Sequence, residues 1–128
     1  MKRFNYYLAL FALLPIAGGI YLWGVRNRIP QIQTFEICNY QYYIDNFPEQ
    51  EKVEPVSDIA DLLKSVEEIW LRKYGVHIKK QKPYQVFYDN ENEVWLVTGS
   101  VRPITEGGVA YILIDGITGD VLAVWHDK

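Results

Sequence analysis

The sequence predicts an α+β fold in which one long helix packs on a curled antiparallel four-stranded meander, preceded by an N-terminal transmembrane helix. Three observations lead to this prediction. An uncharged run of twenty residues begins at residue 6, an apolar stripe at helical spacing begins near residue 57, and four segments rich in Val, Ile, Tyr and Trp follow it. The 128 residues accordingly divide into a membrane anchor or signal sequence (1–28), a tether with an early element (29–56) and an α+β domain (57–128).

The uncharged run covers residues 6–25. As a helix it would span roughly 30 Å, the thickness of the hydrocarbon layer of a bilayer. Small residues at 15–19 leave a cleavable signal peptide as an alternative, but the apolar run continues past them and favours an uncleaved anchor. Basic residues flank the run almost equally. We expect a single-pass membrane protein with its N-terminus in the cytoplasm and its body extracytoplasmic.

The charge of the chain is unevenly distributed. Residues 1–28 hold four basic residues and no acid, so residues 29–128 hold nine basic and 16 acidic residues and a net charge of −7. An acidic body argues against nucleic acid as a partner and suits a basic protein instead. Cys38 is the single cysteine, which excludes an internal disulfide and a cysteine-based zinc site.

Residues 29–56 show weaker patterns. Residues 31–37 alternate polar and apolar side chains like a short strand, residues 39–47 are rich in Tyr and Phe, and residues 48–55 form a charged loop bounded by prolines. We favour an early element that packs on the core. A contact patch remains the alternative, and it would be built from Tyr40, Tyr42, Tyr43 and Phe47.

The long helix has clear limits. Ser57 is a suitable N-cap, and Asp58 and Asp61 suit the positive end of the helix dipole. Gly75 stands where a helix C-terminus favours a left-handed residue. The apolar stripe between these ends consists of Ile59, Leu62, Leu63, Val66, Ile69 and Trp70.

Four strands are expected after the helix, at residues 84–88, 94–101, 109–115 and 121–126. Residues 89–93 and 115–120 read as hairpin turns, with Gly116 and Gly119 able to adopt positive φ, and residues 102–108 form a longer connection. Gly99 indicates a bulge.

The residues that carry chemistry form no recognisable catalytic or metal-binding pattern. His77 and His126 are the only histidines, Cys38 has no base near it in sequence, and the acidic turn at 89–93 lacks the glycine and distal Glu of a calcium loop. Catalytic, cofactor-binding and metal-binding residues are therefore not predicted, and neither is an enzyme. Charges that no core requires lie in two loops at the open edge of the sheet, and we expect the following residues to contact a partner: Asp89, Glu91, Glu93, Arg102 and Glu106.

A specific resemblance rests on four motifs. They are Lys82-Pro83-Tyr84, Val94-Trp95, Gly107-Gly108-Val109-x-Tyr111-Ile112 and a terminal His126-x-Lys128. Over residues 57–128 this pattern resembles the nuclear-transport-factor-2-fold immunity proteins of bacterial polymorphic toxin systems. The resemblance implies a cystatin-like, nuclear-transport-factor-2-like fold. It also implies a non-catalytic protein without a cofactor, which binds and neutralises a cognate toxin. The net charge of −7 on residues 29–128 would suit a basic toxin.

Two alternatives stay open. Residues 109–124 are also similar to the last hairpin of peptidase-propeptide and regulatory (PepSY) domains, which implies a membrane-tethered module with a peptidase-inhibitory or sensory role. A curled sheet around a helix is also compatible with a small-molecule enzyme in a cone-shaped pocket. Such an enzyme needs a carboxylate or histidine inside the cone, where the sequence offers mainly apolar side chains.

Overall fold

The computed structural model of the protein describes residues 29–101 and 107–127. The expected anchor at 1–28, the expected contact residues Arg102 and Glu106, and Lys128 lie outside the described residues. Within the ranges that are described, none of the helices has the length and apolar character needed to span a membrane.

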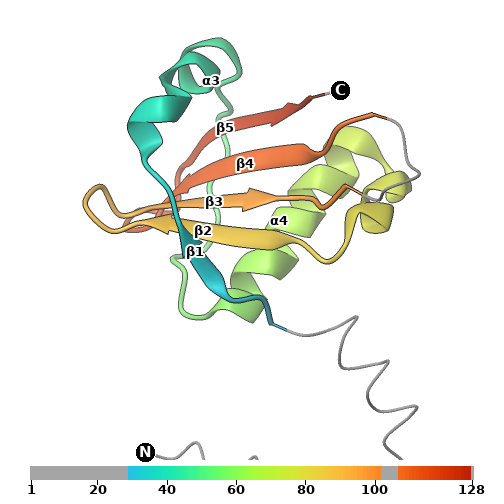
Figure 1. The fold of residues 1–128 in the computed structure, drawn as a ribbon, viewed down its shortest axis with the longest axis horizontal. Helices are drawn as coiled ribbons and strands as arrows, with labels where there is room; N and C mark the ends of the chain where they lie inside the picture. Colours follow the sequence, from blue (N-terminus) through green and yellow to red (C-terminus); the bar gives the residue numbers. More distant parts are fainter. Residues whose placement is uncertain (1–28, 102–106, 128) are drawn as a thin grey trace, which may run out of the picture.

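The body is built on a five-stranded sheet (Figure 1). The strands are β1 (Ile32–Thr34), β2 (Gln85–Asp89), β3 (Val94–Thr98), β4 (Ala110–Asp115) and β5 (Val121–His126), and they lie in that order across the sheet. Strands β2 to β5 form the predicted antiparallel meander. The expected four-stranded sheet is nevertheless wrong by one strand, because β1 pairs with β2 in parallel.

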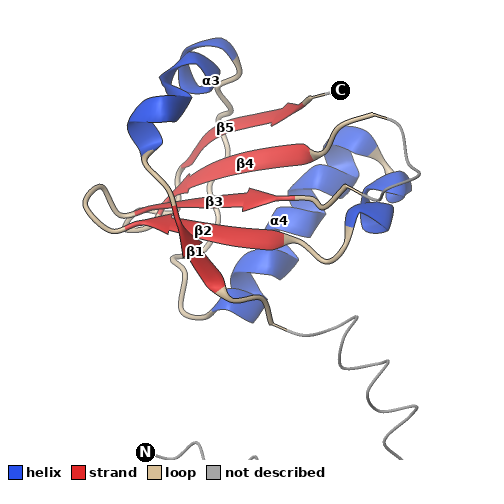
Figure 2. Cartoon of the chain, in the orientation of Figure 1, coloured by secondary structure: helices blue, strands red, loops and turns tan. Residues whose placement is uncertain are grey.

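The long helix α4 (Ile59–Tyr74) packs across one face of this sheet (Figure 2). Its N-cap is Asp58, whose carboxylate accepts a hydrogen bond from the backbone N–H of Asp61 at 2.8 Å, so the expected cap at Ser57 is wrong by one residue. Gly75 ends the helix with a φ of 89°, in the region that glycine tolerates best. A 3₁₀ helix, η3 (Val76–Gln81), follows and leads into β2.

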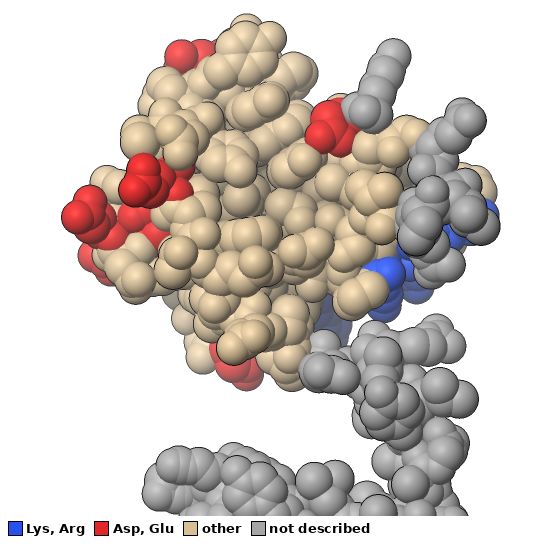
Figure 3. All heavy atoms as spheres, in the orientation of Figure 1, with Lys and Arg blue, Asp and Glu red and all other residues tan. Residues whose placement is uncertain are grey.

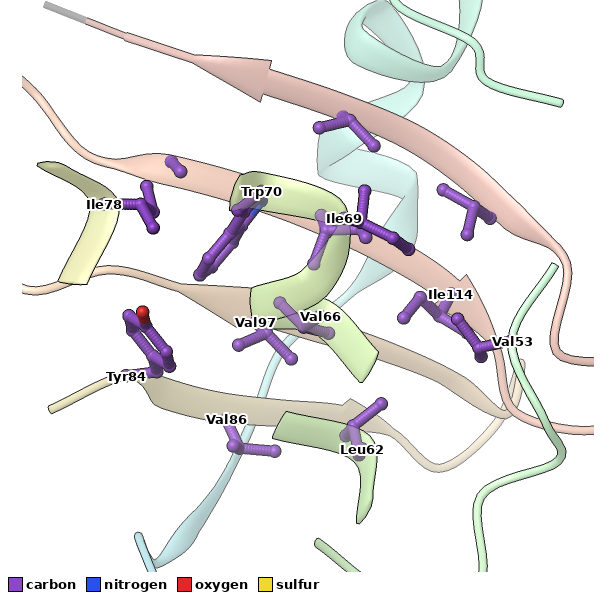
Figure 4. Packing of buried hydrophobic residues seen from close by; sticks show 14 residues of the cluster. Val53, Leu62, Val66, Ile69, Trp70, Ile78, Tyr84, Val86, Val97 and Ile114 are labelled. Carbon is purple, nitrogen blue, oxygen red and sulfur yellow. The ribbon is translucent and has the colours of Figure 1, made fainter. Parts of the chain in front are cut away.

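The main core lies between α4 and the sheet (Figure 4). Trp70 is fully buried there and meets the ring of Tyr84 edge to face, with 5.1 Å between ring centroids. Other side chains of this core come from the helix stripe and from the strands, as Figure 4 shows: Leu62, Val66, Ile69, Val86, Val97 and Ile114. Among the described residues, the buried polar or charged side chains are Asp89, the last residue of β2, and Thr98, the last residue of β3.

The opposite face of the sheet is partly covered by residues 37–46, which form the 3₁₀ helix η2 (Ile37–Tyr40) and the short helix α3 (Gln41–Asn46). Tyr43 stacks on one side of the Trp125 ring at 4.2 Å, and Tyr111 stacks on Trp125 at 4.9 Å. Side chains between Phe35 and Ile44 therefore pack on this face of the sheet. Tyr42 and Phe47 remain 63% and 40% exposed.

The segment after α3 runs beside β5. The backbone N–H of Val53 donates to Gly119 at 2.8 Å, and that of Val121 donates to Glu51 at 2.9 Å. Gly119 has the expected positive φ, 84°, whereas Gly116 is not among the glycines with positive φ. The irregularity of the sheet lies between Leu113 and Ile114 in β4, so the expected bulge at Gly99 is wrong.

Gly99 has a different structural role. A side chain at this position would collide with Gln81 of η3, and the backbone N–H of Ser100 donates to the carbonyl of Gln81 at 2.7 Å. Glycine is therefore needed for close approach of the chain to η3, and the strand that was expected to reach residue 101 ends at Thr98.

Candidate partner-binding surface

The turn between β2 and β3 is organised by a buried carboxylate. Asp89 is 5% exposed, and its carboxylate accepts hydrogen bonds from the backbone N–H groups of Ile37 at 2.9 Å, Glu91 at 3.0 Å and Asn92 at 3.0 Å. These bonds hold the pKa of Asp89 below its usual value, and the bond from Ile37 contributes most. Asp89 therefore fixes the turn and leaves little surface to a partner.

Glu91 and Glu93 of the same turn are exposed, and Glu36 is exposed across from them at the start of η2. A hollow of about 380 Å³ separates the two segments. Phe35, Glu36, Cys38, Tyr88 and residues 89–92 line it, together with Thr34. Among the residues that the structure describes, none of these three glutamates forms an ion pair.

Glu93 also has an unusual backbone. Its φ is 56°, which makes it the one positive-φ residue other than glycine in the described part of the chain. Its carbonyl accepts a hydrogen bond of 2.7 Å from the N–H of Gly116, so the β2–β3 and β4–β5 turns are joined at this point. A charged residue stands here although glycine would fit the backbone better.

The β4–β5 turn lies at the same end of the sheet. Asp115 accepts hydrogen bonds from the N–H groups of Ile117 at 2.8 Å and Thr118 at 2.9 Å, and the bond from Thr118 is the larger cause of its lowered pKa. Asp120 pairs with Lys52 at 3.4 Å, while Ile117 is 64% exposed at the tip. This end of the sheet, which we call the acidic end, is defined by Glu36, residues 89–93 and residues 115–120.

Three of the five expected contact residues lie in the described part of the chain. Asp89, Glu91 and Glu93 share the acidic end, whereas the connection that holds Arg102 and Glu106 leaves the sheet near Thr98 and returns near Ala110. Successive connections of an antiparallel meander alternate between the two ends of the sheet, so this connection starts at the opposite end (Figure 1). Glu36 was not predicted, because an isolated acid before a short helix carries no signal in the sequence.

The histidines and the cysteine do not assemble into a reactive group. His126 contacts Gln81, with 3.0 Å between side-chain nitrogens, and its ring lies 5.4 Å from that of Tyr74. His77 is exposed on η3, and Cys38 is exposed in the hollow at the acidic end. Within residues 29–101 and 107–127, no three His, Cys, Asp or Glu side chains are grouped so as to hold a metal ion.

Comparison with known proteins adds the family. A model of the NTF2 fold immunity protein family matches residues 63–128, which include most of α4, all of β2 to β5 and the hairpin that resembled a PepSY domain. No curated protein matches the chain. No solved structure matches it either. Since the family match covers more than half of the 128 residues, the chain belongs to the NTF2 fold immunity protein family.

Proposed function

We propose that the protein neutralises a cognate toxin by binding it, without catalysing a reaction, and that the acidic end is the contact surface. The family match supports toxin neutralisation. The observation that carries the choice of surface is a set of three exposed carboxylates that form no ion pair with any described residue: Glu36 and Glu91 line one hollow, and Glu93 stands in the same turn as Glu91. Such a surface suits a basic protein.

The shape of the acidic end suggests how a basic toxin would be held. Phe35 and Tyr88 give the hollow apolar walls, while Glu36 and Glu91 place carboxylates beside them. A long basic side chain of the toxin would pack its methylene groups on the aromatic rings and bring its charge to the carboxylates. The exposed charges would mainly raise the association rate, and the buried apolar contact would slow dissociation.

We include a membrane anchor in the same proposal. Residues 6–25 would anchor the chain, with the folded body extracytoplasmic, so that an incoming toxin is met before it enters the cell. The twenty uncharged residues of this run support the anchor.

The proposal is tested first by identifying the partner. The full chain, tagged at its C-terminus, is extracted from its own cells, and the protein that co-purifies in stoichiometric amount is expressed alone in a susceptible host. Toxicity that is relieved by co-expression of this chain would support neutralisation. A co-purified peptidase that loses activity in the complex would favour the PepSY-like alternative instead.

The contact surface is then tested by charge reversal. We expect Glu91→Lys combined with Glu93→Lys to weaken binding of the purified toxin by about tenfold or more, because rim charges act on association and on complementarity. The matched control is Glu54→Lys with Glu68→Lys, which makes the same charge change at two exposed residues beside a different hollow, next to α4. Unchanged affinity in the first variant, or an equal loss in the control, would contradict the choice of surface.

A further inference from the structure

The end of the sheet opposite the acidic end carries the reverse charge. Lys79 and Lys80 lie exposed on η3, and Lys82 follows the last residue of η3. In Figure 3 most acidic residues gather on the left, whereas Lys and Arg gather on the lower right of the folded body. Lys82 pairs with Glu67 at 3.4 Å. No described carboxylate lies within 4.0 Å of the ammonium group of Lys79 or Lys80, so these two charges face solvent.

Two acidic groups at this end of the sheet, Glu67 and Asp127, are engaged within the protein. Glu67 accepts a hydrogen bond of 2.6 Å from the hydroxyl of Tyr84 in addition to its pairing with Lys82. Asp127, at the end of β5, accepts bonds of 2.8 Å from the N–H of Val109 and the hydroxyl of Tyr111. The positive charge on η3 is therefore not cancelled by a free carboxylate among the described residues.

Two apolar side chains are exposed at the same end. Val76, the first residue of η3, is 66% exposed, and Val101 is 62% exposed. The bond from the N–H of Ser100 to the carbonyl of Gln81 holds the segment that leads to Val101 against η3. Lysines beside exposed apolar side chains are the combination by which peripheral proteins bind a lipid surface.

The path of the chain leads to this end as well. Because β1 is parallel to β2, the chain enters β1 at the end of the sheet where η3 leads into β2. The sequence places the twenty uncharged residues 6–25 immediately before this point, followed by Arg26 and Arg28. A membrane that holds residues 6–25 would thus lie nearest to η3 and farthest from the acidic end.

We propose that this basic end, defined by Val76, Lys79, Lys80, Lys82 and Val101, docks on an anionic phospholipid surface. The lysines bind lipid phosphates, and the two valines enter the headgroup region. Docking orients the domain so that the acidic end points away from the membrane. This role goes beyond toxin neutralisation and concerns the opposite end of the molecule, and it rests on the membrane anchor proposed above for residues 6–25.

The test uses the full chain with a polarity-sensitive fluorophore on a single cysteine. One sample carries it on Val76→Cys in a Cys38→Ser background, and the matched control carries it on the native Cys38 at the acidic end. Each is reconstituted into phosphatidylcholine vesicles with and without phosphatidylglycerol. We expect at least a twofold rise in fluorescence at position 76 that requires phosphatidylglycerol and is reversed by 1 M salt, and no change at Cys38.

Charge reversal completes the test. Lys79→Glu with Lys80→Glu should abolish the response at position 76, and the milder pair Lys79→Gln with Lys80→Gln, which adds no repulsion, should abolish most of it. Circular dichroism verifies that each variant is folded. An equal response in vesicles without phosphatidylglycerol, an equal response at Cys38, or a response that survives in folded variants would each overturn the proposal. Binding to free polyphosphate but not to vesicles would overturn it too.

Discussion

The carboxylate of Asp89 accepts a hydrogen bond from the backbone N–H of Ile37, 2.9 Å away and 52 residues earlier in the chain. This contact joins the β2–β3 turn to the start of η2. It therefore fixes one wall of the hollow relative to the other and sets the positions from which Glu36 and Glu91 project. A buried acid in this turn thus shapes a surface that exposed acids would use.

We expect Asp89→Asn to lower the melting temperature at pH 7, because an amide oxygen accepts these N–H bonds less strongly than a carboxylate does. Since folding lowers the pKa of Asp89, its ionised form stabilises the folded state at pH values above the ordinary pKa of about 3.8. That stabilisation is lost as the pH falls through the lowered folded-state pKa. Thermal unfolding between pH 7 and pH 2 should therefore show the difference between wild type and variant shrinking. A difference that does not change with pH would contradict this role.

Glu93→Gly should separate stability from binding. Glycine relieves the positive φ of 56°, which costs a side-chain-bearing residue about 1 kcal/mol, but it also loses more entropy on folding. We expect a net gain of up to about 1 kcal/mol in the free energy of unfolding, measured with urea, together with weaker binding of the toxin. Glu91→Gly, at an exposed position without positive φ, is the control and should bring no gain.

The stacked pair Tyr43 and Trp125 should contribute measurably to the docking of α3. Tyr43→Ala is expected to cost about 1–3 kcal/mol of unfolding free energy, and a double-mutant cycle with Trp125→Ala should give a coupling of about 1 kcal/mol. Tyr42→Ala, at a side chain that is 63% exposed, should cost less than about 1 kcal/mol. Equal costs for the two tyrosines would show that α3 is not held by this stack.

The contact between residues 47–53 and β5 can be tested by substituting Gly119. Gly75, which also has a positive φ, is the control. Gly75→Ala meets no atom within 4 Å and should cost only the backbone strain, about 1–3 kcal/mol. Gly119→Ala would add a collision with the carbonyl of Val53 and disturb the bond from the N–H of Val53, so it should cost about 1 kcal/mol more. Urea unfolding of both variants measures the difference, and a smaller cost at Gly119 would contradict a close backbone approach.

Periodicity predicted the parts of the fold that bury one apolar face. The stripe from Ile59 to Trp70 and the four strands after it correspond to α4 and β2 to β5. Alternation marked residues 31–37 as a possible short strand, but the pairing of β1 with β2 had no signal, because all three residues of β1 are exposed and the pairing spans more than fifty residues of sequence. Ser57 and Asp58 are both good caps by type, so only the geometry of the chain distinguishes them.

The candidate site was predictable only as a charged turn. Residue type marks Glu91 and Glu93 as exposed, but it marks Asp89 in the same way. Whether that carboxylate turns inward depends on the N–H of Ile37, which a distant segment supplies. Glu36 reaches the site for a similar reason, through the parallel pairing of β1 with β2 that precedes it.

The backbone bonds that residues 47–53 make to β5 also bear on how copies of this protein behave toward one another. An uncovered edge strand offers its N–H and C=O groups to any other strand and so promotes aggregation. Here the N–H groups of Val121 and Val124 are already bonded to Glu51 and Phe47. The other edge of the described sheet is β1, which is three residues long. In the proposed role the protein accumulates before its toxin arrives, and this covered edge keeps the waiting copies from pairing into larger sheets.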